Sequence, residues 1–135
     1  MKHFLTILLI ILISGCAIND GNNRLNITQK VSMIQLINNP EKYDGKKISV
    51  QGYLTIAFEE NVIYFHKDDY DNSIYKNAIW LGISEEFVKK FDIHPPFKCY
   101  ITVEGVYKKI DPGFTSLFSG EIEDITFMAR LQNRE

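Results

Sequence analysis

The sequence has few cysteines, no excess of positive charge and none of the common catalytic motifs. Two cysteines, Cys16 and Cys99, are too few for the disulfide framework of a small secreted scaffold. The net charge of −2 makes nucleic acid a poor electrostatic partner, because proteins that bind it usually present a basic stripe. The chain contains no G-x-S-x-G, no H-E-x-x-H, no glycine-rich phosphate loop and no zinc-type Cys and His spacing. We therefore expect no enzymatic activity and no cofactor.

The first residues have the pattern of an export signal. A basic start, Met1-Lys2-His3, precedes an apolar run from Phe4 to Ile13, and the small residues Ser14-Gly15 follow it. The run is too short to cross a bilayer, which takes about 20 helical residues. We predict that residues 1–15 are a signal peptide and are removed.

The tetrapeptide Ile13-Ser14-Gly15-Cys16 resembles the lipobox of bacterial lipoproteins. In that family the cysteine becomes the first residue of the mature chain and carries the lipids, palmitate among them. The resemblance implies that Cys16 anchors the protein to a membrane surface. Several acyl chains on one cysteine bind a membrane stably, whereas a single chain binds only weakly. Ala17 follows the cysteine in place of the aspartate that retains such proteins, which favours the outer membrane facing the periplasm. An ordinary secretory signal with a chance cysteine is the alternative.

Residues 16–30 are polar and rich in asparagine, and we interpret them as the lipidated cysteine with a flexible tether. Residues 31–135 then form one domain with a single core. Ser32 and Gln35 have the spacing of a capping box and predict a short helix over residues 32–38, which Pro40 cannot continue. We expect this helix to cap one side of a sheet.

A long strand follows the Asp44-Gly45 turn, because apolar and polar residues alternate from Ile48 to Phe58. Gly52 lies on its apolar face, and a glycine there indicates a bulge, a bend or a close backbone approach. The strand ITVEGVY, residues 101–107, repeats the pattern of ISVQGY, residues 48–53. Two long strands, each bent at a glycine, are what the closure of a small barrel requires.

The remaining elements complete the order of an OB-fold. NVIYFH (61–66) predicts a hairpin partner, residues 68–76 a polar excursion, and NAIWLGI (77–83) a third strand. Ser84 begins a helix, Asp111-Pro112-Gly113 makes a turn, and residues 118–131 form the last strand. We predict a mainly β protein with short helices, namely a five-stranded antiparallel Greek-key barrel with a helix between strands 3 and 4.

The segment SMIQLINNPEKYDGKKISVQGYL and the later VEGVY resemble small exported bacterial domains that are often lipoproteins. Such domains are described as OB-fold or nucleic-acid-binding-like and are mostly of unknown function. The resemblance covers about Val31 to Met128 and is strongest at Asn39-Pro40-x-x-Tyr43-Asp44-Gly45-Lys46. It implies the fold and no particular activity.

Four residues at the end of the second strand and in the segment after it are weak candidates for a metal site: His66, Asp68, Asp69 and Asp71. Carboxylates suit a hard cation, but the spacing does not match an EF-hand loop, so a solvated acidic loop is the better interpretation. His66 and His94 could act as an acid–base pair if the fold brought them together. Cys99, in a strand-like segment, is expected to be a small buried apolar residue, with a reactive thiol as the alternative.

Tyrosines are the candidate ligand contacts, with Tyr53, Tyr64 and Tyr107 as the predicted binding residues. Exposed aromatic rings on OB-folds stack on bases or pack against proteins. Tyr53 is the best candidate because it lies on the polar face of its strand, and cross-strand packing is the alternative role for it.

The sequence favours a non-enzymatic, lipid-anchored binding or adaptor domain of the cell envelope. Its partner would be a protein or another envelope component. The alternatives are a domain that binds single-stranded nucleic acid, an immunity or inhibitor lipoprotein of the periplasm, and a metal or small-ligand binder around residues 66–71.

Overall fold

A computed structural model describes residues 27–58, 60–110 and 117–132 of the chain. The predicted signal peptide, Cys16, most of the tether and the turn at residues 111–113 lie outside these residues. Within them, no helix has the length and apolar character needed to cross a membrane.

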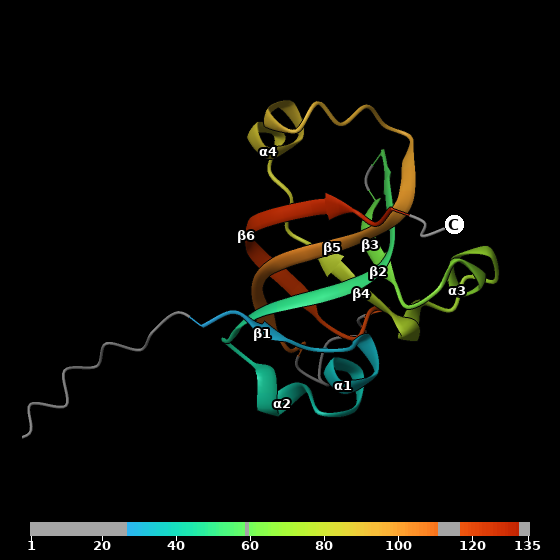
Figure 1. Ribbon diagram of the computed structural model, residues 1–135. Coiled ribbons are helices and arrows are strands. Elements are labelled where there is room, and N and C mark those ends of the chain that lie inside the picture. The colour runs from blue at the N-terminus through green and yellow to red at the C-terminus, as the bar shows by residue number, and fades with distance from the viewer. Residues whose placement is uncertain (1–26, 59, 111–116, 133–135) are drawn as a thin grey trace, which may run out of the picture.

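The protein is mainly β with short helices, as predicted (Figure 1). The strands are β1 (Gln29–Lys30), β2 (Lys47–Ala57), β3 (Glu60–Tyr64), β4 (Ala78–Leu81), β5 (Phe97–Lys108) and β6 (Glu121–Arg130). The helices are α1 (Met33–Asn38), α2 (Pro40–Tyr43), α3 (Lys67–Asp71), α4 (Glu85–Lys90) and the 3₁₀ turn η1 (Tyr75–Asn77).

The six strands form one sheet that partly closes into a ring. Their order is β1-β2-β3-β4-β6-β5, and β5 pairs again with β2. Two features differ from the predicted five antiparallel strands. The short β1 is added parallel to β2, and β4 pairs with β6 in parallel through Trp80 and Leu81.

Both differences depend on backbone hydrogen bonds that leave no trace in the side-chain pattern. The N–H of Val31 donates to the carbonyl of Ser49 at 2.9 Å, which extends the pairing begun by β1. The N–H of Trp80 donates to the carbonyl of Gly120 at 3.0 Å, where β6 enters beside β4. Ordered pairing thus starts at Gln29, inside the segment interpreted as a tether.

The two sequence repeats are strand partners. In the β2–β5 pair, Val50 lies opposite Val103, Ile48 opposite Gly105, and Gly52 opposite Ile101. The repeated pattern therefore pairs with itself in antiparallel register, and each glycine faces the isoleucine of the other strand.

The glycines lie where the long strands change neighbours. β2 pairs with β1 at Ile48 and Ser49 but with β3 only from Tyr53 onward, so Gly52 stands between the two partners. In the β5–β6 pair, the register shifts between Glu104 and Val106, on either side of Gly105. The prediction that both strands bend at their glycines agrees with this, and β2 is visibly coiled in Figure 1.

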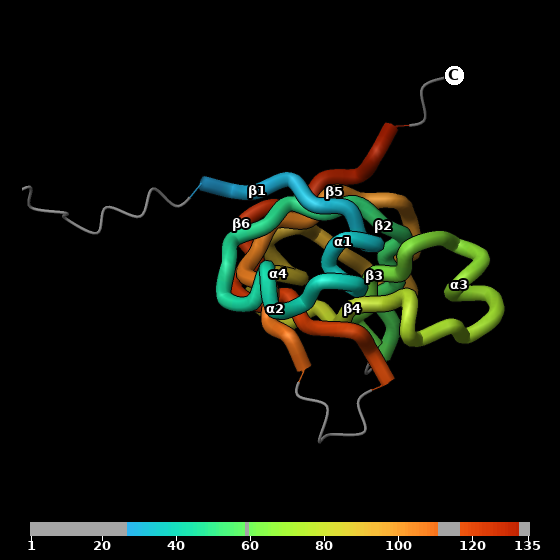
Figure 2. Tube along the Cα trace, turned by 90° about the horizontal axis from the view of Figure 1, so that it is seen from below, coloured from blue at the N-terminus to red at the C-terminus, as the bar shows by residue number. Residues whose placement is uncertain are grey.

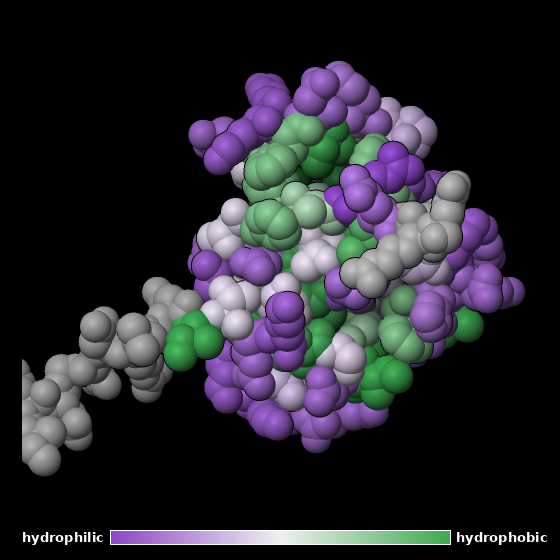
Figure 3. Space-filling view, viewed as in Figure 1, coloured by the Kyte–Doolittle hydropathy of each residue, from purple (hydrophilic) through white to green (hydrophobic). Residues whose placement is uncertain are grey.

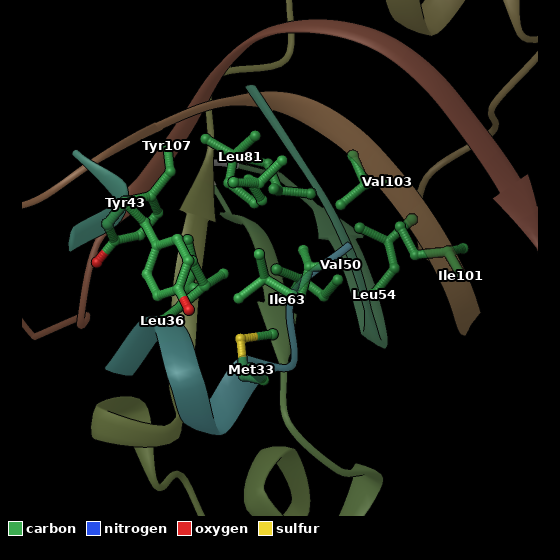
Figure 4. Packing of buried hydrophobic residues seen from close by; sticks show 14 of the residues in the cluster. Met33, Leu36, Tyr43, Val50, Leu54, Ile63, Leu81, Ile101, Val103 and Tyr107 are labelled. Carbon is green, nitrogen blue, oxygen red and sulfur yellow. The ribbon is translucent and has the colours of Figure 1, made fainter. Parts of the chain in front are cut away.

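Helix α1 covers one open end of the ring, in agreement with the prediction. Ser32 is its N-cap and forms the predicted capping box with Gln35. Met33 and Leu36 are buried and point from α1 into the ring (Figure 4), and the view from below shows α1 across the opening (Figure 2). The helix ends at Asn38, and Pro40 starts α2.

The main core cluster lies inside the ring. Its fully buried members come from α1 and from the inward faces of the strands, among them Leu36, Ile48, Leu54, Ile63, Leu81, Val103, Tyr107 and Ile122. Burying a side chain of this kind contributes about 1.5–3 kcal/mol. Cys99 is also buried in this cluster, and burial raises the pKa of its thiol. The prediction that Cys99 is buried is confirmed.

Candidate functional site

The outer face of β2, β3 and β4 carries a second cluster of aromatic residues. Tyr53 and Tyr64 are its buried rings, with exposures of 8% and 1%. The segment of α3 and η1 lies beside this face (Figure 1). Its Tyr70 and Tyr75 pack on the cluster. This polar excursion therefore covers the rings that the sequence suggested as stacking surfaces.

Tyr53 is not an exposed contact, so that expectation is wrong. Its ring makes an edge contact with Tyr100 of β5 at 5.1 Å and lies 6.0 Å from Tyr70. The alternative role, cross-strand packing, is the one observed, because Tyr53 and Tyr100 are direct partners in the β2–β5 register.

Tyr107 belongs to the main core and is fully buried. Its hydroxyl donates to the carbonyl of Ser119 at 3.0 Å, and burial raises its pKa to about 12. Burial also raises the pKa of Tyr64, whose hydroxyl donates to Glu60 at 2.9 Å. A ligand role for Tyr53, Tyr64 and Tyr107 stays a prediction, but none of them offers the exposed ring on which it depended.

Two of the weak metal candidates, Asp69 and Asp71, have structural partners instead. Asp69 is buried, and its carboxylate accepts from the backbone N–H of His66 at 2.9 Å and from the amide of Asn77 at 2.7 Å. Asp71 pairs with Lys67. Asp68 is exposed. Within the described part of the chain, no three His, Cys, Asp or Glu side chains gather as a metal site. Asp69 thus holds the two ends of the α3–η1 excursion together.

The suggested histidine pair has separate partners. The ring of His66 lies 4.0 Å from that of Phe65, whereas Nε2 of His94 lies 3.0 Å from Asp92 in an exposed pair.

A groove with a volume of about 770 Å³ lies on the outer face of the β2–β5 ribbon. We call it the ribbon groove. Figure 3 views the molecule from the side of β1, β2 and β5, where apolar and polar side chains are interspersed. The lining residues come from β1, the start of α1 and the connection between them, from β2, from the two residues after β3, from β5 and from beyond β6: Lys30, Val31, Ser32, Met33, Ser49, Gln51, Gly52, Phe65, His66, Tyr100, Thr102, Glu104 and Leu131.

The floor of the ribbon groove is polar. Ser49 lies opposite Glu104 and Gln51 opposite Thr102, and the Gln51 amide donates to the Thr102 hydroxyl at 3.1 Å. One side of the groove is formed by the connection from β1 to α1. The aromatic rings of Phe65 and Tyr100 and the side chain of Leu131 give the lining its apolar part. Such a surface offers donors, acceptors and apolar contact together, and its lining holds both charge signs, in Lys30 and Glu104.

The sequence did contain a signal for this floor. The outward positions of the two repeats, Ser49-x-Gln51 and Thr102-x-Glu104, are the polar members of the alternating strands. The side of the groove formed by β1 and its connection to α1 could not be predicted, because β1 has only two residues and shows no hydrophobic period.

Comparisons with protein-family models, with curated proteins and with solved structures each gave no match to this chain.

Proposed function

We propose that this chain is a non-enzymatic, lipid-anchored binding domain of the bacterial cell envelope that holds a segment of a partner protein in the ribbon groove. The observation that carries the proposal is the groove itself, an open hollow of about 770 Å³ on the paired faces of the two longest strands. Ligand sites in proteins usually have volumes of 300–1,000 Å³.

The composition of the groove favours a protein segment over nucleic acid. Its floor presents side-chain hydroxyl and amide groups at Ser49, Gln51 and Thr102, which match the donors and acceptors of a peptide. Glu104 in the same floor would repel a phosphate backbone. Tyr100, 38% exposed, offers an amphipathic ring of the kind enriched at protein interfaces.

The finer fold assignment is also part of the proposal. We propose that β2 to β6 are an OB-fold, with β1 as an addition. The ring order β2-β3-β4-β6-β5 with closure from β5 to β2 supports this, as does the place of α4 between β4 and β5. Because a fold hosts many functions, this assignment does not itself choose the ligand.

Site-specific photo-crosslinking in the exporting bacterium tests the binding site. A benzoyl-phenylalanine at Gln51 or Thr102 should crosslink one defined partner band, whereas the same group at exposed Glu85 or Glu86 of α4 should not. Equal crosslinking at both surfaces, or none at Gln51 and Thr102, would contradict the proposal. Turnover of a substrate by the purified protein would contradict its non-enzymatic part.

The anchor is tested separately. The Cys16→Ser variant should lose labelling by radioactive palmitate and move from the membrane fraction to the soluble periplasm, while Cys99→Ser should leave labelling intact. Palmitate on the Cys16→Ser variant would refute the anchor without bearing on the groove.

The nucleic-acid and immunity alternatives stay predictions. The first expects salt-dependent retention on single-stranded DNA that weakens in Tyr53→Ala. The second expects protection of the cell against a toxin by the anchored protein.

A further inference from the structure

We propose that the free edge of β6 is a self-association surface, to which β6 of a second copy of this chain adds in antiparallel orientation. The edge consists of residues 124–130, DITFMAR. A free strand edge presents unpaired N–H and carbonyl groups, which can pair with another strand. None of these residues lines the ribbon groove, so the inference does not depend on the function proposed above.

The sheet leaves the second half of β6 with one neighbouring strand. β4 pairs with β6 only at Glu121 and Ile122, and the N–H of Gly82 then donates to the carbonyl of Ile122 at 2.9 Å. From Phe127 to Arg130, β6 pairs with β5 and with no other strand among the described residues. In Figure 1 this half of β6 runs along the margin of the sheet, on the far side of β5 from β2. Helix α4 lies beyond the margin, and within the described ranges no hydrogen bond joins it to β6.

The register shows which backbone groups of β6 point away from β5. The N–H of Leu131 donates to the carbonyl of Tyr100 at 2.8 Å. In an antiparallel ladder, every second residue bonds to the same neighbouring strand. Ala129 therefore also bonds to β5, whereas Met128 and Arg130 direct their N–H and carbonyl groups to the free edge.

The side chains along this edge leave it accessible. Phe127, at its centre, is 46% exposed, and Thr126 and Arg130 are exposed as well. Residues 124–130 contain no proline and no lysine, which natural sheets commonly use to block an edge. The irregular part of the β5–β6 pairing ends before Phe127, so the edge is regular from there on.

The charges of β6 favour a second copy in antiparallel orientation. The strand carries Glu121, Glu123 and Asp124 in its first half and Arg130 at its end. Neither Asp124 nor Arg130 has an ion-pair partner among the described residues. Antiparallel pairing of two copies places the acidic half of each strand beside Arg130 of the other, and opposite charges across a strand pair are stabilising. A parallel pair would instead bring like charges together.

One register satisfies the charges and the backbone together. With Phe127 opposite Phe127 of the second copy, Asp124 lies opposite Arg130 and Thr126 opposite Met128. Met128 then takes part in a hydrogen-bonded pair, as the direction of its backbone groups requires. The two Phe127 residues meet at the two-fold axis as a non-hydrogen-bonded pair, in which side chains are closest. The contact uses the same surface of both copies and closes with two.

Disulfide crosslinking of the full chain, on membranes of the exporting bacterium, tests this register. Phe127→Cys should give a dimer band on a non-reducing gel after mild oxidation, because residues directly opposite each other have Cβ atoms about 4.5–5.5 Å apart. Glu86→Cys, at an exposed position of α4, should not. The parent protein, in which Cys99 is buried, gives the background.

An exchange of charges in the Phe127→Cys background separates specific pairing from chance collision. Arg130→Asp should lower the yield of dimer about fivefold, because it places a carboxylate opposite Asp124 of the second copy. Asp124→Arg, added to the same chain, should restore the yield, since the ion pair forms again with its signs exchanged. Lys89→Asp on α4 should leave the yield unchanged.

A third measurement keeps the edge intact in the parent protein. The purified full chain, in an uncharged maltoside detergent, should sediment as a dimer, and Phe127→Asp as a monomer. Leu117→Asp is the matched control, because Leu117 is also an exposed apolar residue, at 59%, and this variant should stay a dimer.

The proposal is overturned if the parent protein is a monomer, or if Phe127→Cys gives no dimer band or is linked to a different protein. Crosslinking of Glu86→Cys to the same extent would overturn it as well. So would a charge exchange that fails to restore the yield.

Discussion

Gly52 of β2 and Tyr64 of β3 approach so closely that a Cβ atom on Gly52 would lie 2.5 Å from the carbonyl oxygen of Tyr64. The side chain of Ile63 would be 2.7 Å from the same Cβ. The glycine is therefore required by close packing at the point where β2 begins to pair with β3. No rotation of a side chain relieves a clash with a backbone oxygen.

Gly52→Ala should lower the free energy of unfolding by about 3 kcal/mol, because an extra methyl group in a packed site forces the backbone to move. Gly82→Ala is the matched control, since its Cβ would meet its nearest atom at 3.5 Å. That change should be neutral or stabilise by up to about 1 kcal/mol through the unfolded state. Urea unfolding of both variants gives the comparison, and equal losses would contradict the close approach.

Tyr107 should make the protein sensitive to alkaline pH. The unfolded side chain loses its proton near its ordinary pKa of 10, whereas burial in the fold delays this to about pH 12. The folded state then holds the proton that the unfolded state has released, so stability falls between these values by about 2–3 kcal/mol. Stability measured from pH 8 to 12 should fall less steeply in Tyr107→Phe.

At neutral pH the same Tyr107→Phe variant should lose about 1 kcal/mol, the contribution of the hydrogen bond to Ser119. If the free energy of unfolding falls equally steeply with pH in the variant and in the parent protein, Tyr107 does not cause the alkaline sensitivity. Tyr64 still contributes to the slope in both, because burial and Glu60 raise its pKa as well.

Replacing Thr55 by valine should stabilise the protein. Its hydroxyl is buried and has no hydrogen-bond partner among the described residues, and the side chain is 1% exposed. Thr55→Val keeps the shape and removes the unsatisfied group, so we expect a gain of about 1 kcal/mol. Thr102→Val is the control, because its hydroxyl accepts from Gln51, and it should lose stability slightly. A loss in Thr55→Val would reveal a partner for the hydroxyl.

Asp69 should control the order of the α3–η1 excursion. Asp69→Ala removes two hydrogen bonds to a carboxylate, those from His66 and Asn77, at a cost of about 2 kcal/mol or more. Hydrogen exchange should quicken first over residues 67–77, and limited iodination should reach Tyr64. Asp68→Ala, at an exposed position, should leave exchange unchanged. Uniform acceleration across the sheet in Asp69→Ala would contradict a local role.

Periodicity alone was sufficient for much of the fold. The alternation from Ile48 to Phe58, the glycine in each repeat and the Ser32–Gln35 capping box are local patterns, and the structure has β2, β5 and α1 where they predict them. The candidate site was harder to predict from the sequence. Tyr53 stands on the polar face of its strand, so its burial was hidden until Tyr70 and Tyr100 were seen to pack on it.

The sequence by itself determined the longer strands, β2 to β6, their bends at Gly52 and Gly105, and the capping of α1, because each depends on neighbours within a few residues. Only the tertiary structure decided that the two repeats pair with each other, that β4 and β6 run in parallel, and that an excursion buries Tyr64. These outcomes depend on which distant segments share backbone hydrogen bonds and packing surface. A linear pattern of side chains does not specify that choice.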